Sequence, residues 1–89
     1  MNELFEATRN GDIETVKQLI DSNHSIINEK DEGSWGILHI SASSGNYVLC
    51  KLLIETYGVN LNARTDEGKT ALHYAASKGY FNIVCLLLE

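Results

Sequence analysis

Self-similarity at a spacing of 34 residues limits the folds open to this sequence. When the chain is shifted by that spacing, Leu4 falls in line with Leu38, and Leu38 with Leu72. Further positions repeat in the same register, namely Gly11, Gly45 and Gly79; Val16, Cys50 and Val84; and Leu19, Leu53 and Leu87. A fixed period of this length is typical of a tandem array in which each unit packs on its neighbours. The sequence therefore predicts a three-unit solenoid.

Each unit carries two helical patterns separated by a glycine. In the second pattern of the first unit, Ile13, Val16 and Ile20 lie on one apolar stripe at helical spacing. Glycine reaches the left-handed conformation without steric cost, so Gly11 and its equivalents are expected to end the first helices. Side-chain caps are expected at helix starts, from Asn2, Asp12, Asn46 and Thr70.

The third unit contains Gly68-Lys-Thr-Ala-Leu-His-Tyr-Ala-Ala-Ser-Lys-Gly79, followed by Ile83, Val84 and three leucines. This stretch closely resembles the ankyrin repeat, whose Thr-Pro-Leu-His hallmark is Thr70-Ala71-Leu72-His73 here. The second unit departs further, with Gly36-Ile37-Leu38-His39, and the first keeps only the leucine. Several columns recurring at one period are more specific than any single four-residue match.

The resemblance covers the whole chain and implies an all-α ankyrin-repeat solenoid of stacked helix-turn-helix units joined by hairpin-like turns. Because the connecting segments are polar and contain glycine, we expect little regular strand in them. One ankyrin repeat domain would then cover residues 1–89, with repeat 1 at about 2–30, repeat 2 at about 31–64 and an incomplete repeat 3 at about 65–89.

The last repeat stops inside its second helix, at Leu88-Glu89, without a glycine cap. A terminal repeat needs a polar outward face for solubility. The first repeat has polar residues of that kind, whereas we expect the other end to leave apolar surface uncovered at Tyr74, Ile83, Leu86 and Leu87. This pattern predicts an N-terminal fragment of a longer array, or self-association through the uncapped C-terminal repeat.

Composition argues against several classes of protein. No run approaches the ~20 apolar residues that cross a bilayer, and Met1 is not followed by the basic start of a signal peptide. Two cysteines are too few for a disulfide framework, so Cys50 is expected to be a buried thiol and Cys85 a partly exposed one. We expect an intracellular protein, cytoplasmic or nuclear. The net charge of −5 argues against nucleic acid as a partner.

The residues that suggest catalysis or metal binding recur at the repeat period. His39 and His73 would lie about one helix layer, ~10 Å, apart, with no cysteine or carboxylate at ligand spacing. In ankyrin repeats this histidine tightens the turn by hydrogen bonding. Ser43 and Ser77 share a column but lack the base and orienting group that a nucleophile needs. We therefore expect no catalytic residue, no metal site and no cofactor.

The resemblance places a partner-facing concave side on the turns and on the ends of the first helices. We call this set the concave face; it comprises Arg9, Asn10, Lys30, Glu32, Trp35, Ser43, Ser44, Arg64, Asp66, Glu67, Lys69, Ser77 and Lys78. Five of these residues are basic and three acidic, so the face carries +2 while the rest of the chain carries −7. A mixed, solvated surface explains this polarity equally well. If the polarity is functional, it favours a partner with an acidic patch.

Trp35 leaves two alternatives open. It falls in the turn column that Lys69 occupies in the third unit. The indole either folds back to cover its own turn or anchors a partner, since tryptophan is enriched among residues that dominate binding energy.

The sequence predicts a non-catalytic protein–protein interaction module. The alternative is a regulatory or targeting ankyrin segment of a larger multidomain enzyme. The native reading frame after Glu89 would discriminate between them.

Overall fold

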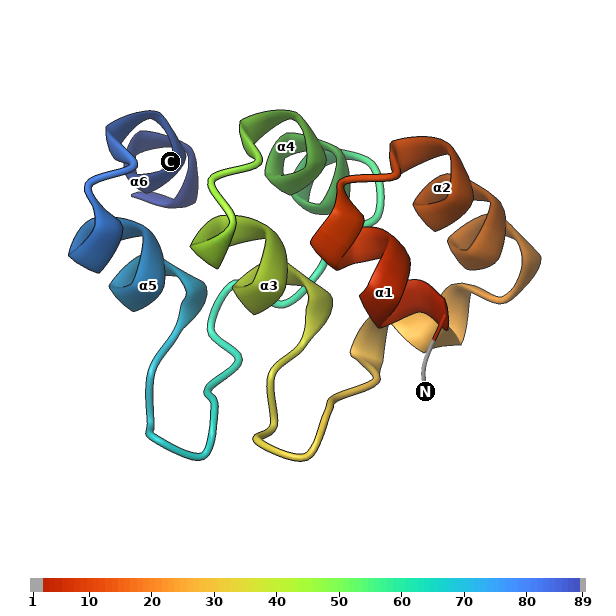
Figure 1. Ribbon diagram of the computed structural model, residues 1–89, viewed down its shortest axis with the longest axis horizontal. Helices are drawn as coiled ribbons and strands as arrows, with labels where there is room; N and C mark the ends of the chain where they lie inside the picture. The colour runs from red at the N-terminus through yellow and green to blue at the C-terminus, as the bar shows by residue number, and fades with distance from the viewer. Residues whose placement is uncertain (1–2, 89) are drawn as a thin grey trace.

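The computed structural model describes residues 3–88, which form two rows of helices (Figure 1). The inner row is α1 (Glu3–Asn10), α3 (Ile37–Ser43) and α5 (Ala71–Lys78), and the outer row is α2 (Ile13–Ser22), α4 (Tyr47–Glu55) and α6 (Phe81–Leu88). A short 3-10 helix, η1 (His24–Asn28), follows α2 and was not expected from the sequence. Within the described residues there is no strand, and the predicted all-α solenoid is confirmed.

The helix pairs stack side by side in chain order. In the inner row α3 packs against both α1 and α5, and in the outer row α4 packs against α6. Two turns, at residues 31–35 and 65–69, project beyond the inner row on the side away from the outer helices (Figure 1). The amide of Asp66 donates to the carbonyl oxygen of Gly33 at 2.9 Å, so the two turns are joined.

Glycine ends the inner helices as the sequence predicts. Gly11 and Gly79 adopt φ values of +72° and +76°, in the left-handed region that other residues avoid. Side chains cap two outer helices: Asp12 accepts from the Thr15 amide at 3.3 Å and Asn46 accepts from the Leu49 amide at 3.0 Å. The proposed cap at Asn2 lies outside the described residues.

A histidine, not a hydroxyl, holds the start of the second and third inner helices. Nδ1 of His39 accepts from the Gly36 amide at 3.0 Å, and Nδ1 of His73 accepts from the Thr70 amide at 2.9 Å. The Thr70 hydroxyl lies 2.9 Å from the same His73 nitrogen, and the His73 amide donates to the Thr70 carbonyl oxygen at 3.1 Å. The hydrogen bond expected from a helix amide to the Thr70 hydroxyl is therefore replaced by a contact between that hydroxyl and the His73 ring. The structural role expected for the histidines is confirmed.

The core is a row of apolar layers between neighbouring repeats. Val16, Leu53 and Ile83 are fully buried in it. Cys50 is also buried, and its thiol donates to Oγ of Ser41 at 3.4 Å, whereas Cys85 is exposed. Burial raises the pKa of the Cys50 thiol. Both cysteines thus have the environments expected for them.

The apolar surface at the C-terminal end differs in part from the expectation. Ile83 and Leu86 are buried, because they lie one turn apart on the side of α6 that packs against α4 and α5. Leu87 is half-buried. The large side chains that this end leaves exposed are instead Phe81, at 76%, and Leu88, at 67%.

Candidate partner-binding face

A hollow of about 300 Å³ opens between the inner helices and the first turn. The C-terminal ends of α1 and α3 form one side of it and the turn at residues 31–35 forms the other. We call it the inner hollow; it is lined by Arg9, Asp31, Trp35, Ile40, Ser43 and Ser44.

Asp31 fixes the shape of the turn beside the hollow. Its Oδ1 accepts from the amides of Gly33 and Trp35, each at 2.9 Å, and its backbone amide donates to the Trp35 carbonyl oxygen at 3.0 Å. Ser34 takes a left-handed φ of +64° between them. The other carboxylate oxygen of Asp31 lies 3.9 Å from the Arg9 guanidinium, a loose ion pair whose Arg9 side chain is 52% exposed. The turn is thus held rigid while Arg9 stays accessible.

An aromatic cluster connects this turn to the third repeat. The rings of Trp35 and Tyr74 lie 4.3 Å apart between centroids, and the ring of His39 meets that of Trp35 at 6.0 Å in a T-shaped contact. The ammonium of Lys69 lies 5.9 Å from the centre of the Tyr74 ring. The half-buried indole therefore packs on Tyr74 of the third repeat, a contact that neither alternative for Trp35 described. The role of Trp35 as a partner anchor remains a prediction.

The ends of the inner helices bring together a further part of the predicted set. Nζ of Lys78 donates to the carbonyl oxygen of Ser43 at 3.0 Å, so a lysine from the third repeat reaches the end of α3. Asn10, Ser44 and Ser77 are exposed along the same row of helix ends. Arg9 and Lys78 consequently stand on either side of the two serines that end α3.

The turn-tip residues of the predicted set lie apart from the inner hollow. Glu32, Asp66 and Glu67 are exposed at the tips. Arg64 is partly engaged, because its Nη1 donates to the Gly68 carbonyl oxygen at 3.0 Å. The predicted set therefore divides into helix ends that carry two cations and turn tips of mixed charge.

The family model for ankyrin repeats, described as three copies, matches residues 4–89. The chain belongs to the ankyrin repeat family. This family is a non-catalytic fold whose repeats bind other proteins. Within residues 3–88, no helix of this ankyrin array is both long enough and apolar enough to cross a membrane.

Two relatives in other organisms show how much longer such proteins can be. An ankyrin repeat protein of Fowlpox virus is 36% identical over 78 residues, which are 88% of this chain and 18% of that protein. A protein of Dictyostelium discoideum named as a probable serine/threonine-protein kinase is 32% identical over 78 residues, which are 84% of this chain and 9% of that protein. This chain therefore spans less than a fifth of either relative.

A solved structure has the same fold. It is a chain from the complex of a predatory endopeptidase of Bdellovibrio bacteriovorus with an immunity protein. The match has 31% sequence identity and a TM-score of 0.88, and it covers 99% of this chain and 45% of that one. The similar chain is thus part of a protein–protein complex.

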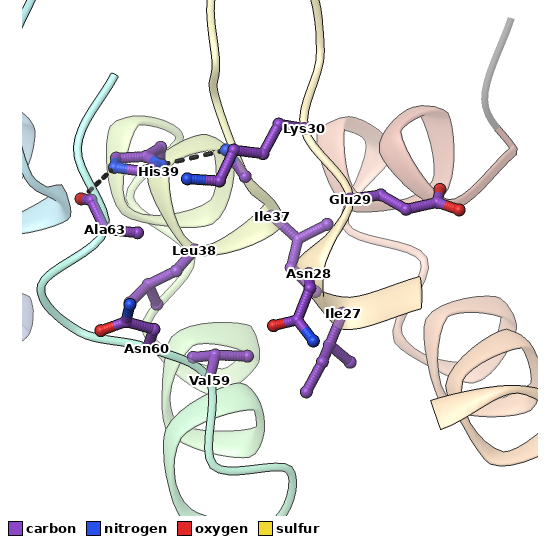
Figure 2. Close-up of a pocket in the computed structure, with 11 residues that line it drawn as sticks. Ile27, Asn28, Glu29, Lys30, Ile37, Leu38, His39, Val59, Asn60 and Ala63 are labelled. Atoms are coloured by element: carbon purple, nitrogen blue, oxygen red, sulfur yellow. Dashed lines mark hydrogen bonds between the residues drawn. The ribbon is translucent and has the colours of Figure 1, made fainter. Parts of the chain in front are cut away.

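A second, smaller pocket of about 110 Å³ lies between the connections that follow the first and second repeats (Figure 2). Figure 2 shows Lys30 extended toward His39 across this pocket, which removes Lys30 from the inner hollow. Both ring nitrogens of His39 are engaged, since Nε2 lies 2.9 Å from the Ala63 carbonyl oxygen. Burial and, to a lesser extent, the nearby Lys30 charge lower the pKa of His39, although the bond to Ala63 opposes this. The histidine here ties the start of α3 to the connection that follows α4.

Asp31 and Ile40 line the inner hollow but were missed by sequence reasoning. The column of Ile40 contains Glu6 in the first repeat and Tyr74 in the third, so it changes in every unit, whereas the core columns keep similar residues. Such variation on an inner helix could have indicated that this column lies beside the concave face and outside the repeated core. Asp31 precedes a glycine by two residues, a spacing at which aspartate commonly accepts turn amides.

Proposed function

We propose that this ankyrin array binds a protein partner carrying an acidic patch, through its concave face and without catalysis. The observation that carries the proposal is the inner hollow, which lies between a rigid turn and helix ends bearing Arg9 and Lys78. We propose that this occurs inside the cell, in the cytoplasm or nucleus.

Rigidity supports recognition by this face. Asp31 holds its turn through two amide bonds, and the Asp66 amide ties the next turn to Gly33. The contact of Lys78 with Ser43 likewise joins two helix ends. A surface that is already ordered loses little conformational entropy when a partner binds, so more of the contact energy appears as affinity.

The charge of the face supports an acidic partner. Asp31 adds one carboxylate to the predicted set and lowers its net charge from +2 to +1, which leaves −6 on the rest of the chain. The positive charge concentrates at the helix ends, where Arg9 faces the single carboxylate of Asp31 and Lys78 contacts the Ser43 carbonyl oxygen. A complementary potential of this kind speeds association and orients the partner.

The alternative function is a regulatory or targeting segment of a larger enzyme. One observation favours it, namely that the similar Dictyostelium protein is named as a probable kinase and that the matched part is only 9% of its length. Sequencing the native reading frame beyond Glu89 tests this alternative, since a catalytic domain would either be encoded there or not.

The proposed function is tested by association kinetics with the partner that the immobilised chain captures from its source cell. Replacing Lys69 and Lys78 with glutamate should slow association about tenfold at low salt, and the difference should shrink as salt screens the charges. The matched control replaces Lys17 and Lys51, on the outer helices, with glutamate and should have far less effect. Equal slowing by the two pairs would contradict a polarised concave face.

A further inference from the structure

The inner hollow offers more hydrogen-bond donors than its own residues use. The Arg9 guanidinium has five N–H donors, yet among the described residues its one polar contact is Asp31 at 3.9 Å, beyond ordinary hydrogen-bond length. Ser43 and Ser44 line the same hollow, and within residues 3–88 their hydroxyls make no side-chain hydrogen bond. The hollow can therefore donate to an acceptor without breaking an internal hydrogen bond of these groups.

The floor of the hollow is apolar. Ile40 is only 6% exposed, and the half-buried Trp35 indole stands beside it. A methylene stem can pack on this floor while a polar head reaches the donors at the rim. That combination suits an amphipathic side chain better than a small free ion.

The charges around the hollow favour an anionic head over a cationic one. Asp31 is already engaged, because its Oδ1 accepts from two amides and its Oδ2 faces Arg9. The Ser43 carbonyl oxygen, which could attract a cation, is occupied by the Lys78 ammonium at 3.0 Å. A lysine or arginine of the partner would meet the like charge of Arg9 in the hollow and that of Lys78 at the end of α3, and such juxtaposition costs binding energy.

We infer that the inner hollow is a subsite for the carboxylate of a partner's glutamate or aspartate side chain. The planar guanidinium of Arg9 presents paired donors that match the two oxygens of a carboxylate. The hydroxyls of Ser43 and Ser44 donate to the same group, and its stem packs on Ile40 and Trp35. This subsite rests on the proposed function, because it specifies which group of the partner the concave face recognises.

The test uses a display library of short random peptides selected against the immobilised chain. The enriched peptides should share a glutamate or aspartate, and changing it to glutamine or asparagine should weaken binding about tenfold or more. In the variant Arg9→Gln, the acidic peptide and its amide counterpart should bind equally, because the interacting pair has been removed. Arg9→Lys should retain part of the difference in affinity between the acidic peptide and its amide counterpart, since lysine keeps the positive charge but lacks the paired donors of the guanidinium.

The controls separate failure of the subsite from failure of the proposed function. Lys17→Gln, on α2, should leave the tenfold difference intact, and circular dichroism should show every variant folded. Peptides that lose affinity with Ser44→Arg but need no acidic residue would overturn the carboxylate subsite and leave concave-face recognition standing. Selection of no peptide, or only of peptides indifferent to Arg9, Ser44 and Lys78, would overturn both.

Discussion

The second and third repeats share an alanine and a histidine at equivalent positions, but these residues differ in burial. Ala42 is fully buried whereas Ala76 is exposed, and His39 is 2% exposed whereas His73 lies at the surface. α3 has neighbours on both sides in the inner row, and α5 packs on α3 alone among the inner helices. In this array the neighbouring repeat, more than the residue type, decides which side chains are core.

The first and third repeats differ in residue type at positions that are equivalent in the array. The columns that face the preceding repeat hold Ile83 and Leu86 in α6, both buried, but they hold the polar residues Thr15 and Gln18 in α2. The end of the array formed by the first repeat, which packs on no other repeat in this structure, is therefore polar. The opposite end, formed by the third repeat, exposes Phe81. Self-association through that third repeat remains a proposal.

The largest difference in the stability cost of a substitution between the second and third repeats is expected in the outer helices. Leu53→Ala should lower the free energy of unfolding by about 3 kcal/mol, because it empties a fully buried site. Leu87→Ala, in the same column but half-buried, should cost about 1 kcal/mol by the lost burial of apolar area. Urea unfolding of both variants measures the gap. Equal costs would mean that stacking does not determine burial here.

The histidine column should show the next largest difference. His39→Ala removes a ring that bonds to Gly36 and to Ala63, so it should destabilise the fold by about 2 kcal/mol. His73→Ala removes only the bond to Thr70 among the described residues and should cost about 1 kcal/mol or less. Thermal and urea unfolding provide the measurement. A reversed order would refute the role of His39 as a tie between the start of α3 and the connection after α4.

A smaller effect is expected from acid. Nδ1 of His39 accepts a hydrogen bond in its neutral form, and burial sets its folded-state pKa below the ordinary value of about 6.5. The unfolded chain therefore binds this proton more readily, so stability is full above pH 6.5 and falls as pH drops through the lowered folded pKa. Unfolding free energies across this range should show the loss in wild type and in His73→Ala, and a reduced loss in His39→Gln.

The smallest effect on stability is expected at Phe81. Its side chain is 76% exposed, so Phe81→Ser should change the free energy of unfolding by about 0.5 kcal/mol or less. Tyr47, in the same column of the second repeat, is half-buried against the core, and Tyr47→Ser should cost more. Sedimentation at high concentration adds a second readout. Association by wild type that Phe81→Ser abolishes would support the proposed self-association, and a monomeric wild type would contradict it.

Much of the fold could be predicted because the period aligns residues with the same physical role. The left-handed glycines follow from backbone sterics, and the histidine contacts follow from the family resemblance. The burial of Ile83 and Leu86 was predicted wrongly, because the period alone does not say which side of a helix faces the preceding unit. The 3-10 helix η1 was missed because the connection after the first repeat has no apolar pattern strong enough to indicate a helix.

The candidate site was less predictable from the sequence. Resemblance named Arg9, Ser43 and Ser44, which do line the inner hollow. It could not show that Lys30 would turn toward His39, since that depends on the path of two connections distant in sequence. Nor could it show that Trp35 would pack on a tyrosine from the next repeat, because tertiary packing determines that contact.

Hydrogen–deuterium exchange of the chain with and without its captured partner tests the central claim, recognition through the concave face, most directly. The account predicts slower exchange at the ends of α1, α3 and α5 and at the turn of residues 31–35, with little change in the outer helices. Protection confined to α2, α4 and α6 would contradict it.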